Sequence, residues 1–125
     1  MNVWRVDDPA LYDEKHFTIR HLFESNHLVV VWFGFVPGQV LRDHQTSSHA
    51  LIQCISGAIR VESMGETVEL TMGMSVVIEP HVVHALYANE RALVQLSITP
   101  HPSQHSLLDE LQLSTVSGES IETKP

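Results

Sequence analysis

The sequence is poor in cysteine, in positive charge and in long apolar runs, and each shortage excludes a class of protein. Cys54 is the one cysteine among 125 residues, so the chain cannot close an internal disulfide or build a metal site on paired thiolates. Seven Lys and Arg stand against 15 Asp and Glu, a formal net charge of −8, which would repel a nucleic-acid backbone or an anionic membrane. The longest apolar stretch, residues 28–36, is interrupted by Gly34 and is far shorter than the roughly 20 residues of a membrane span. We therefore expect neither nucleic acid nor a membrane as a partner.

The length and composition indicate one globular domain. A core is typically built from about 100 to 200 residues, and a chain with 43% hydrophobic and 18% charged residues has the ordinary composition of a folded protein. At the N-terminus Arg5 is followed by Asp7 and Asp8 rather than by an apolar run, which is not the pattern of a signal peptide. We therefore expect a cytoplasmic protein.

The spacing of apolar residues predicts an all-β fold. Short runs rich in Val, Ile and Leu are separated by Gly, Pro, Ser and Asn, and several of them alternate apolar with polar residues. These runs are residues 17–24, 27–36, 49–55, 58–63, 67–70, 75–79, 84–88 and 92–99. Ser56-Gly57 and Met64-Gly65 have the composition of tight reversals, because glycine adopts positive φ at low steric cost.

Three further segments depart from simple alternation. Residues 27–36 are apolar on both faces, so we expect them between layers or in a subunit interface, and a homodimer is predicted on that basis. After Pro100, Ser103 followed by leucines at helical spacing predicts a short C-terminal helix. Residues 114–125 have little to bury and are predicted to be a flexible tail.

Two glycine-framed segments carry a recognisable pattern. The first reads Pro37-Gly38, five residues, His44, then Thr46, Ala50 and Gly57, and the second runs from Gly73 through Pro80 and His81 to His84. This pairing resembles the two motifs of the cupin superfamily, which read Gly, five residues, His-x-His, three or four residues, Glu, six residues, Gly, and then Gly, five residues, Pro-x-Gly, two residues, His, three residues, Asn. The resemblance implies a double-stranded β-helix (jelly-roll) barrel in a single domain over residues 1–113, with its motif core at residues 28–98. It does not fix a function, because this barrel hosts many chemistries.

The ligand positions of the pattern are only partly filled. In metal-binding members of the superfamily the two His and the Glu of the first motif and the His of the second bind Fe, Mn, Ni or Zn. Here Thr46 stands at the second His position and Ala50 at the Glu position, which leaves His44 and His84. A threonine hydroxyl is a poor ligand and a methyl group is none, whereas catalytic sites usually keep three protein ligands.

Other residues near the motifs could replace the missing ligands. His81 and Glu79, at the Gly and first Pro positions of the second motif, lie in a loop at the barrel mouth and are the candidates for a third ligand. His49 is predicted to point outward by strand parity, and Cys54 to be a small buried thiol inside the barrel.

Three functions remain open at this point, and one of them, an interaction protein whose exposed apolar strand is the functional surface, is supported only by the apolar run at residues 28–36. Another is a binding module that takes a small organic molecule in the barrel mouth, with at most a partial metal site. Its polar contacts would be His44, Thr46 and His84, with Gln53 or His81. The third is a divalent-metal-dependent enzyme of dioxygenase or isomerase type, in which the metal is bound by His44, His84 and His81, with Glu79 or water completing its shell. A metal-free enzyme would use one of these histidines as a general base.

Overall fold

A computed structural model of the chain describes residues 1–101, and within them nine β-strands follow one short 3-10 helix. The elements are η1 (Pro9–Leu11), β1 (Thr18–Glu24), β2 (Val29–Phe35), β3 (Val40–His44), β4 (His49–Ser56), β5 (Ala58–Ser63), β6 (Glu66–Thr71), β7 (Ser75–Ile78), β8 (His84–Tyr87) and β9 (Ala92–Thr99). The predicted all-β class is confirmed. The predicted helix after Ser103 and the tail at residues 114–125 lie outside the described residues. None of the helical structure in residues 1–101 is long and apolar enough to cross a membrane.

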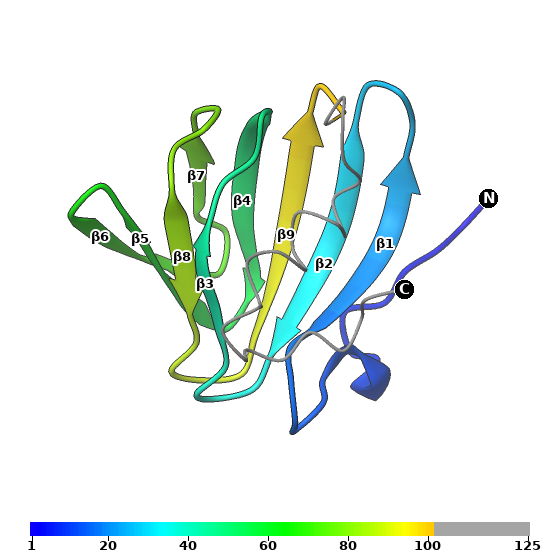
Figure 1. Ribbon diagram of the computed structural model, residues 1–125. Helices are drawn as coiled ribbons and strands as arrows, with labels where there is room; N and C mark the ends of the chain where they lie inside the picture. The colour runs from blue at the N-terminus through cyan, green and yellow to red at the C-terminus, as the bar shows by residue number, and fades with distance from the viewer. Residues whose placement is uncertain (102–125) are drawn as a thin grey trace.

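The strands form two antiparallel sheets that face each other (Figure 1). One sheet has the order β1-β2-β9-β4-β7 and the other has the order β3-β8-β5-β6. Strands distant in sequence are therefore neighbours, with β9 between β2 and β4 and β8 between β3 and β5. This is the predicted jelly roll, and it leaves β6 and β7 as edge strands on the same side of the molecule, where the β5–β6 hairpin projects (Figure 1).

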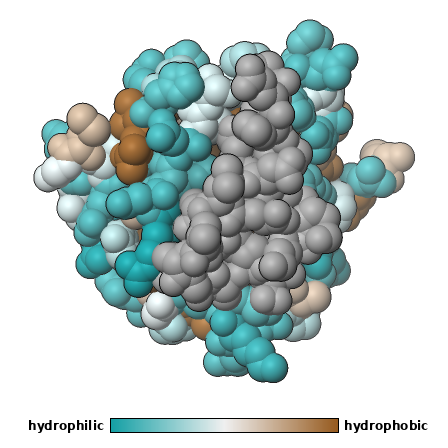
Figure 2. Space-filling model, in the orientation of Figure 1, coloured by the Kyte–Doolittle hydropathy of each residue, from teal (hydrophilic) through white to brown (hydrophobic). Residues whose placement is uncertain are grey.

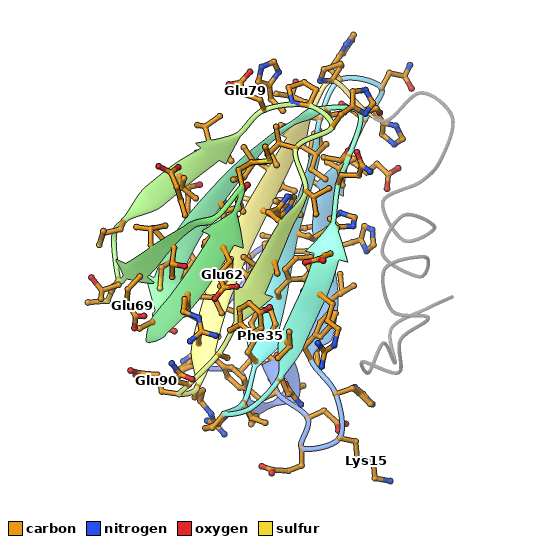
Figure 3. All side chains as sticks on the ribbon, turned by 60° about the vertical axis from the view of Figure 1, so that its left-hand side comes forward. Lys15, Phe35, Glu62, Glu69, Glu79 and Glu90 are labelled. Carbon is orange, nitrogen blue, oxygen red and sulfur yellow. The ribbon has the colours of Figure 1, made fainter. Side chains whose placement is uncertain are left out.

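The apolar faces of both sheets meet in one core. Alternate residues of β4 and β9 point inward, as the sequence pattern predicts, and Cys54 is 1% exposed among them. The rings of Phe17, Phe33 and Phe35 pack against one another in edge-to-face and tilted arrangements, with centroids 5.3 to 6.1 Å apart. Figure 3 places Phe35 away from the barrel end that carries Glu79. The aromatic cluster therefore lies in the part of the barrel that is distant from Glu79.

The doubly apolar strand β2 is covered on its second face by the chain itself. Phe33 joins the main core, whereas Trp32 packs in a smaller cluster with Leu11 and Leu93. A homodimer is predicted above because this second face would need a partner. Since Leu11 of η1 packs on that face, the face does not need a second chain to cover it, and the homodimer stays a prediction.

Close approach of two backbones explains the glycine in β2. A Cβ built on Gly34 would lie 1.8 Å from the carbonyl oxygen of Leu11. The hydroxyl of Thr18 on the neighbouring strand donates a hydrogen bond to that same oxygen. The absence of a side chain at Gly34 therefore allows η1 to pack closely against the outer face of the sheet.

The tight reversals predicted at Ser56-Gly57 and Met64-Gly65 are confirmed, since Gly57 and Gly65 have positive φ angles of 77° and 81°.

The variant Gly34→Ala should be destabilised, because its methyl group meets backbone that cannot rotate away. We expect a loss of about 1–3 kcal/mol in the free energy of unfolding, measured by urea denaturation. Gly65→Asn is the matched control, since nothing lies within 4 Å of a Cβ there and asparagine tolerates positive φ. If Gly34→Ala unfolded at the same urea concentration as the parent chain, this account of η1 would be wrong.

Candidate functional site

A β-bulge in β3 turns His44 into the barrel. Leu41 pairs with Leu86 and His44 pairs with His84. Between these two pairs β3 advances by three residues and β8 by only two, so β3 contains one extra residue. In a regular strand Leu41 and His44 would face opposite sides of the sheet. The bulge absorbs the extra residue, and both side chains are buried while the two residues between them are exposed.

The structure brings His44 and His84 together, as the motif resemblance implies. Their ring centroids are 5.4 Å apart and the ring planes meet at 81°. They are 5% and 3% exposed. Burial lowers the pKa of His44 to about 3, with a smaller contribution from the neighbouring His84. Burial also lowers the pKa of His84, although a backbone hydrogen bond opposes the shift. Both rings are therefore neutral at pH 7.

Hydrogen bonding distinguishes the nitrogens of the pair. Nδ1 of His84 lies 3.1 Å from the carbonyl oxygen of Val82, so Nδ1 carries the proton and Nε2 of the neutral ring is an acceptor. Nε2 of His44 is buried and has no hydrogen-bond partner within residues 1–101. An unpartnered buried polar atom costs about 1–3 kcal/mol, and native structures contain few of them.

A cleft of about 460 Å³ opens between the edge strands β6 and β7. Its lining is mostly aliphatic and comprises Val61, Ser63, Met64, Glu66, Thr67, Val68, Val76, Val77, Ile78, Glu79 and Val82. Ser63 pairs with His84 across β5 and β8, and Ile78 pairs with Ala50 across β7 and β4. Two lining residues of the cleft are therefore cross-strand neighbours of His84 and of Ala50, which stands at the glutamate position of the motif, although His84 and Ala50 do not themselves line the cleft. Figure 2 shows a small apolar patch near the hairpin on a largely hydrophilic face.

Motif reasoning missed the cleft residues Ser63, Glu66 and Val82, because none stands at a motif position. The available signal was the Met64-Gly65 reversal. It makes Ser63 and Glu66 cross-strand partners, and residues paired in this way share one face of a sheet.

Thr46 and His81 join the two loops beside the pair. The backbone N–H of His81 donates to the carbonyl oxygen of Thr46 at 2.8 Å, and the buried Thr46 hydroxyl accepts the N–H of Ser48 at 3.3 Å. The side chain of His81 is exposed and its φ is 65°, which keeps the left-handed backbone that glycine would adopt at this motif position. The observed contacts of both residues hold the loops together rather than complete a ligand set.

His49 and Glu79 form an exposed pair outside the barrel. Nε2 of His49 lies 3.1 Å from Oε1 of Glu79, and Figure 3 places Glu79 at the end of the barrel. The outward orientation predicted for His49 is confirmed. Glu79 is thus held by a surface imidazole, away from the buried pair.

Gln53 lies on the outer face of its sheet, which corrects its assignment to the barrel mouth. Its neighbours Ile52 and Cys54 face the core, so strand alternation turns Gln53 outward. There it accepts a hydrogen bond from Gln95 at 3.3 Å, and Gln95 accepts one from Trp32 at 3.0 Å.

The residues present do not form a complete metal site. The orphaned Nε2 of His44 and the backbone-oriented ring of His84 suit metal ligands. Yet within residues 1–101 no group of three or more His, Cys, Asp or Glu side chains is placed to hold an ion, so His81 and Glu79 do not join the pair. Two neutral imidazoles fall short of the three protein ligands usual in catalytic sites.

Comparison with known proteins agrees with this geometry. The profile of the cupin domain matches residues 31–99, and the chain belongs to the cupin family. A search of curated proteins found no match.

Solved structures similar to this chain include an RmlC-like cupin from Desulfovibrio desulfuricans, at 21% identity and a TM-score of 0.72, covering 80% of this chain and 97% of that one. KdgF from Halomonas is 27% identical with a TM-score of 0.64, covering 79% and 88% of the two chains. A conserved protein of unknown function from Streptococcus pyogenes is 22% identical with a TM-score of 0.67, covering 79% and 90%.

The buried pair should make stability depend on pH. An unfolded histidine has a pKa near 6.5, whereas that of His44 in the fold is about 3, so below pH 6.5 the unfolded chain binds a proton that the folded chain does not. The contribution of the neutral His44 to the free energy of unfolding is therefore fully present above about pH 6.5 and is lost progressively as the pH falls toward 3. We expect a loss of roughly 1 kcal/mol per pH unit from His44, measured by urea denaturation between pH 7 and pH 5.

The variant His44→Gln separates this effect from the titration of carboxylates. This variant lacks the titrating ring, so its free energy of unfolding should fall less steeply between pH 7 and pH 5 than that of the parent chain. Parallel declines in the two proteins would contradict the assignment.

Proposed function

We propose that this protein binds a small organic molecule at the end of the barrel that holds His44 and His84, with the two neutral imidazoles as its hydrogen-bonding groups. The observation that carries the proposal is the buried, unpartnered Nε2 of His44 beside a second neutral ring. A ligand that satisfied this atom would remove the cost of leaving it unpaired. The cleft between β6 and β7 is the route by which such a molecule would reach the pair.

The chemistry of the pair selects the kind of group that would bind. Nε2 of His84 is an acceptor, because Nδ1 donates to Val82. The ligand should therefore present an O–H or N–H to this nitrogen. Neither imidazole carries positive charge at pH 7, so the pair offers no electrostatic attraction to a carboxylate or phosphate.

Ala50, at the position of the family's glutamate, adds no polar group behind the aliphatic lining of the cleft. Ala50 is 1% exposed and pairs with Ile78 of the cleft lining. A methyl group here supplies no charge and leaves more space than a glutamate side chain would. Apolar walls with a few convergent polar groups are typical of small-molecule sites.

A thermal-shift screen of phenols, sugars and organic acids against the full chain is expected to find stabilising ligands. Replacement His44→Phe should lower the affinity of such a ligand about fivefold, because one buried hydrogen bond contributes about 1 kcal/mol. Titration calorimetry with the parent chain and the variant measures the change.

His49→Phe is the control, since it makes the same replacement at an exposed imidazole outside the barrel. Equal affinity in the parent chain and in His44→Phe would overturn the proposed site. So would an equal loss in the two variants.

A metal-dependent enzyme is the second candidate, favoured by the orientation of His84 through Val82, an arrangement common among histidine ligands. Elemental analysis of protein purified without a histidine tag tests it. Because only two ligand positions are filled, we expect less than one equivalent of Fe, Mn, Ni or Zn per chain. The metal content of the His84→Ala variant should be the same as that of the parent chain. Near-stoichiometric metal that His84→Ala removes would instead establish the metal site.

A further inference from the structure

One row of paired residues crosses the sheet from the imidazole pair to the rim of the cleft. His44 pairs with His84, His84 with Ser63, and Ser63 with Glu66. Adjacent strands are spaced about 4.8 Å apart, so Glu66 stands about 10 Å across the sheet from His84. The row has a neutral acceptor at its inner end and a carboxylate at its outer end.

The charges along the cleft are of one sign. Glu66 and Glu79 line it, and none of its lining residues is Lys or Arg. The arginine of β5, Arg60, alternates with the buried Val61 and stacks over the ring of Tyr87 at 4.5 Å, so its guanidinium lies on the other face of the sheet. Glu79 already has His49 as a partner, whereas Glu66 has no ion pair within residues 1–101. Glu66 is therefore the carboxylate available to a ligand.

The wall between the two ends of the row is aliphatic. Val61, Val68, Val76 and Val82 line the cleft from both sheets and from the loop before β8. The side chain of Ser63 also faces this space, but its hydroxyl donates to the carbonyl oxygen of Val83 at 2.9 Å. An apolar ligand body would replace water against these valines, which is favourable by about 25 cal/mol per Å² of apolar surface buried.

We propose that the cleft selects a small amine: a molecule with an apolar, ring-sized body, a hydroxyl that donates to His84 at the inner end, and an ammonium group opposite Glu66 at the outer end. This proposal deepens the proposed function and rests on it. It assigns Glu66 as a specificity-determining residue through charge complementarity, because the cleft offers acidic groups to the ligand and no basic ones. A carboxylate of the same shape is disfavoured at the same position.

Four matched probes separate the two ends of the ligand. The full chain is titrated calorimetrically with 4-(2-aminoethyl)phenol, with 4-ethylphenol, which lacks the ammonium group, with 3-(4-hydroxyphenyl)propionate, which carries a carboxylate instead, and with 2-phenylethylamine, which lacks the hydroxyl. We expect 4-(2-aminoethyl)phenol to bind about fivefold more tightly than 4-ethylphenol, as for a partly exposed ion pair. The carboxylate should bind more weakly than 4-ethylphenol.

Two variants assign the preference to one carboxylate. Glu66→Gln should bring 4-(2-aminoethyl)phenol and 4-ethylphenol to within about twofold of each other, because the removed ion pair is the source of the difference. Glu69→Gln is the matched control on the same strand, since Glu69 does not line the cleft. It should leave the fivefold difference in place, although it removes the same charge from the protein.

The outcomes distinguish this proposal from the proposed function. If 4-ethylphenol binds and 2-phenylethylamine binds more weakly than 4-(2-aminoethyl)phenol, but the ammonium group adds nothing, the hydroxyl contact stands and the amine selectivity is wrong. If both glutamate variants reduce the preference equally, the overall negative charge causes it, and the assignment to Glu66 is overturned. If none of the four probes binds, both proposals fail for this class of ligand.

Discussion

The site depends on the register between β3 and β8. One extra residue in β3 places His44 on the inner face opposite His84, and without it strand alternation would turn His44 toward solvent. The same register continues through Ser63 to Glu66, so a single bulge aligns the imidazole pair with the rim of the cleft. Bulges commonly re-aim side chains near functional sites.

The two ends of the barrel have different interiors for a packing reason. Phe17, Phe33 and Phe35 pack against one another, mostly edge to face, and all three are fully buried between the sheets. The other end holds two neutral imidazoles and the small side chain of Ala50. The cleft lies between the edge strands β6 and β7, which belong to different sheets and are not paired with each other, and its lining includes Ile78 and Glu79.

Burial governs the electrostatics of the pair more than any neighbouring charge does. The chain has a net charge of −8, yet the pKa values of both histidines are lowered, because each ring has lost water without gaining a carboxylate partner. A glutamate at position 50 would have opposed this effect. With a methyl group at position 50, the pair has no carboxylate beside it and both rings stay neutral at pH 7.

The sequence by itself determined the all-β class, the reversals at Gly57 and Gly65, the outward turn of His49 and the pairing of His44 with His84. The first three follow from alternation and from glycine's freedom at positive φ, which are local properties of the chain, whereas the meeting of His44 and His84 is implied by the resemblance of the two segments to the cupin motifs.

Only the tertiary structure decided that η1 covers the second face of β2 and that Ser63 and Glu66 continue the row of the imidazoles. Each of these depends on register between strands or on which segment packs on which face, and such long-range pairing is not encoded in any short stretch of residues.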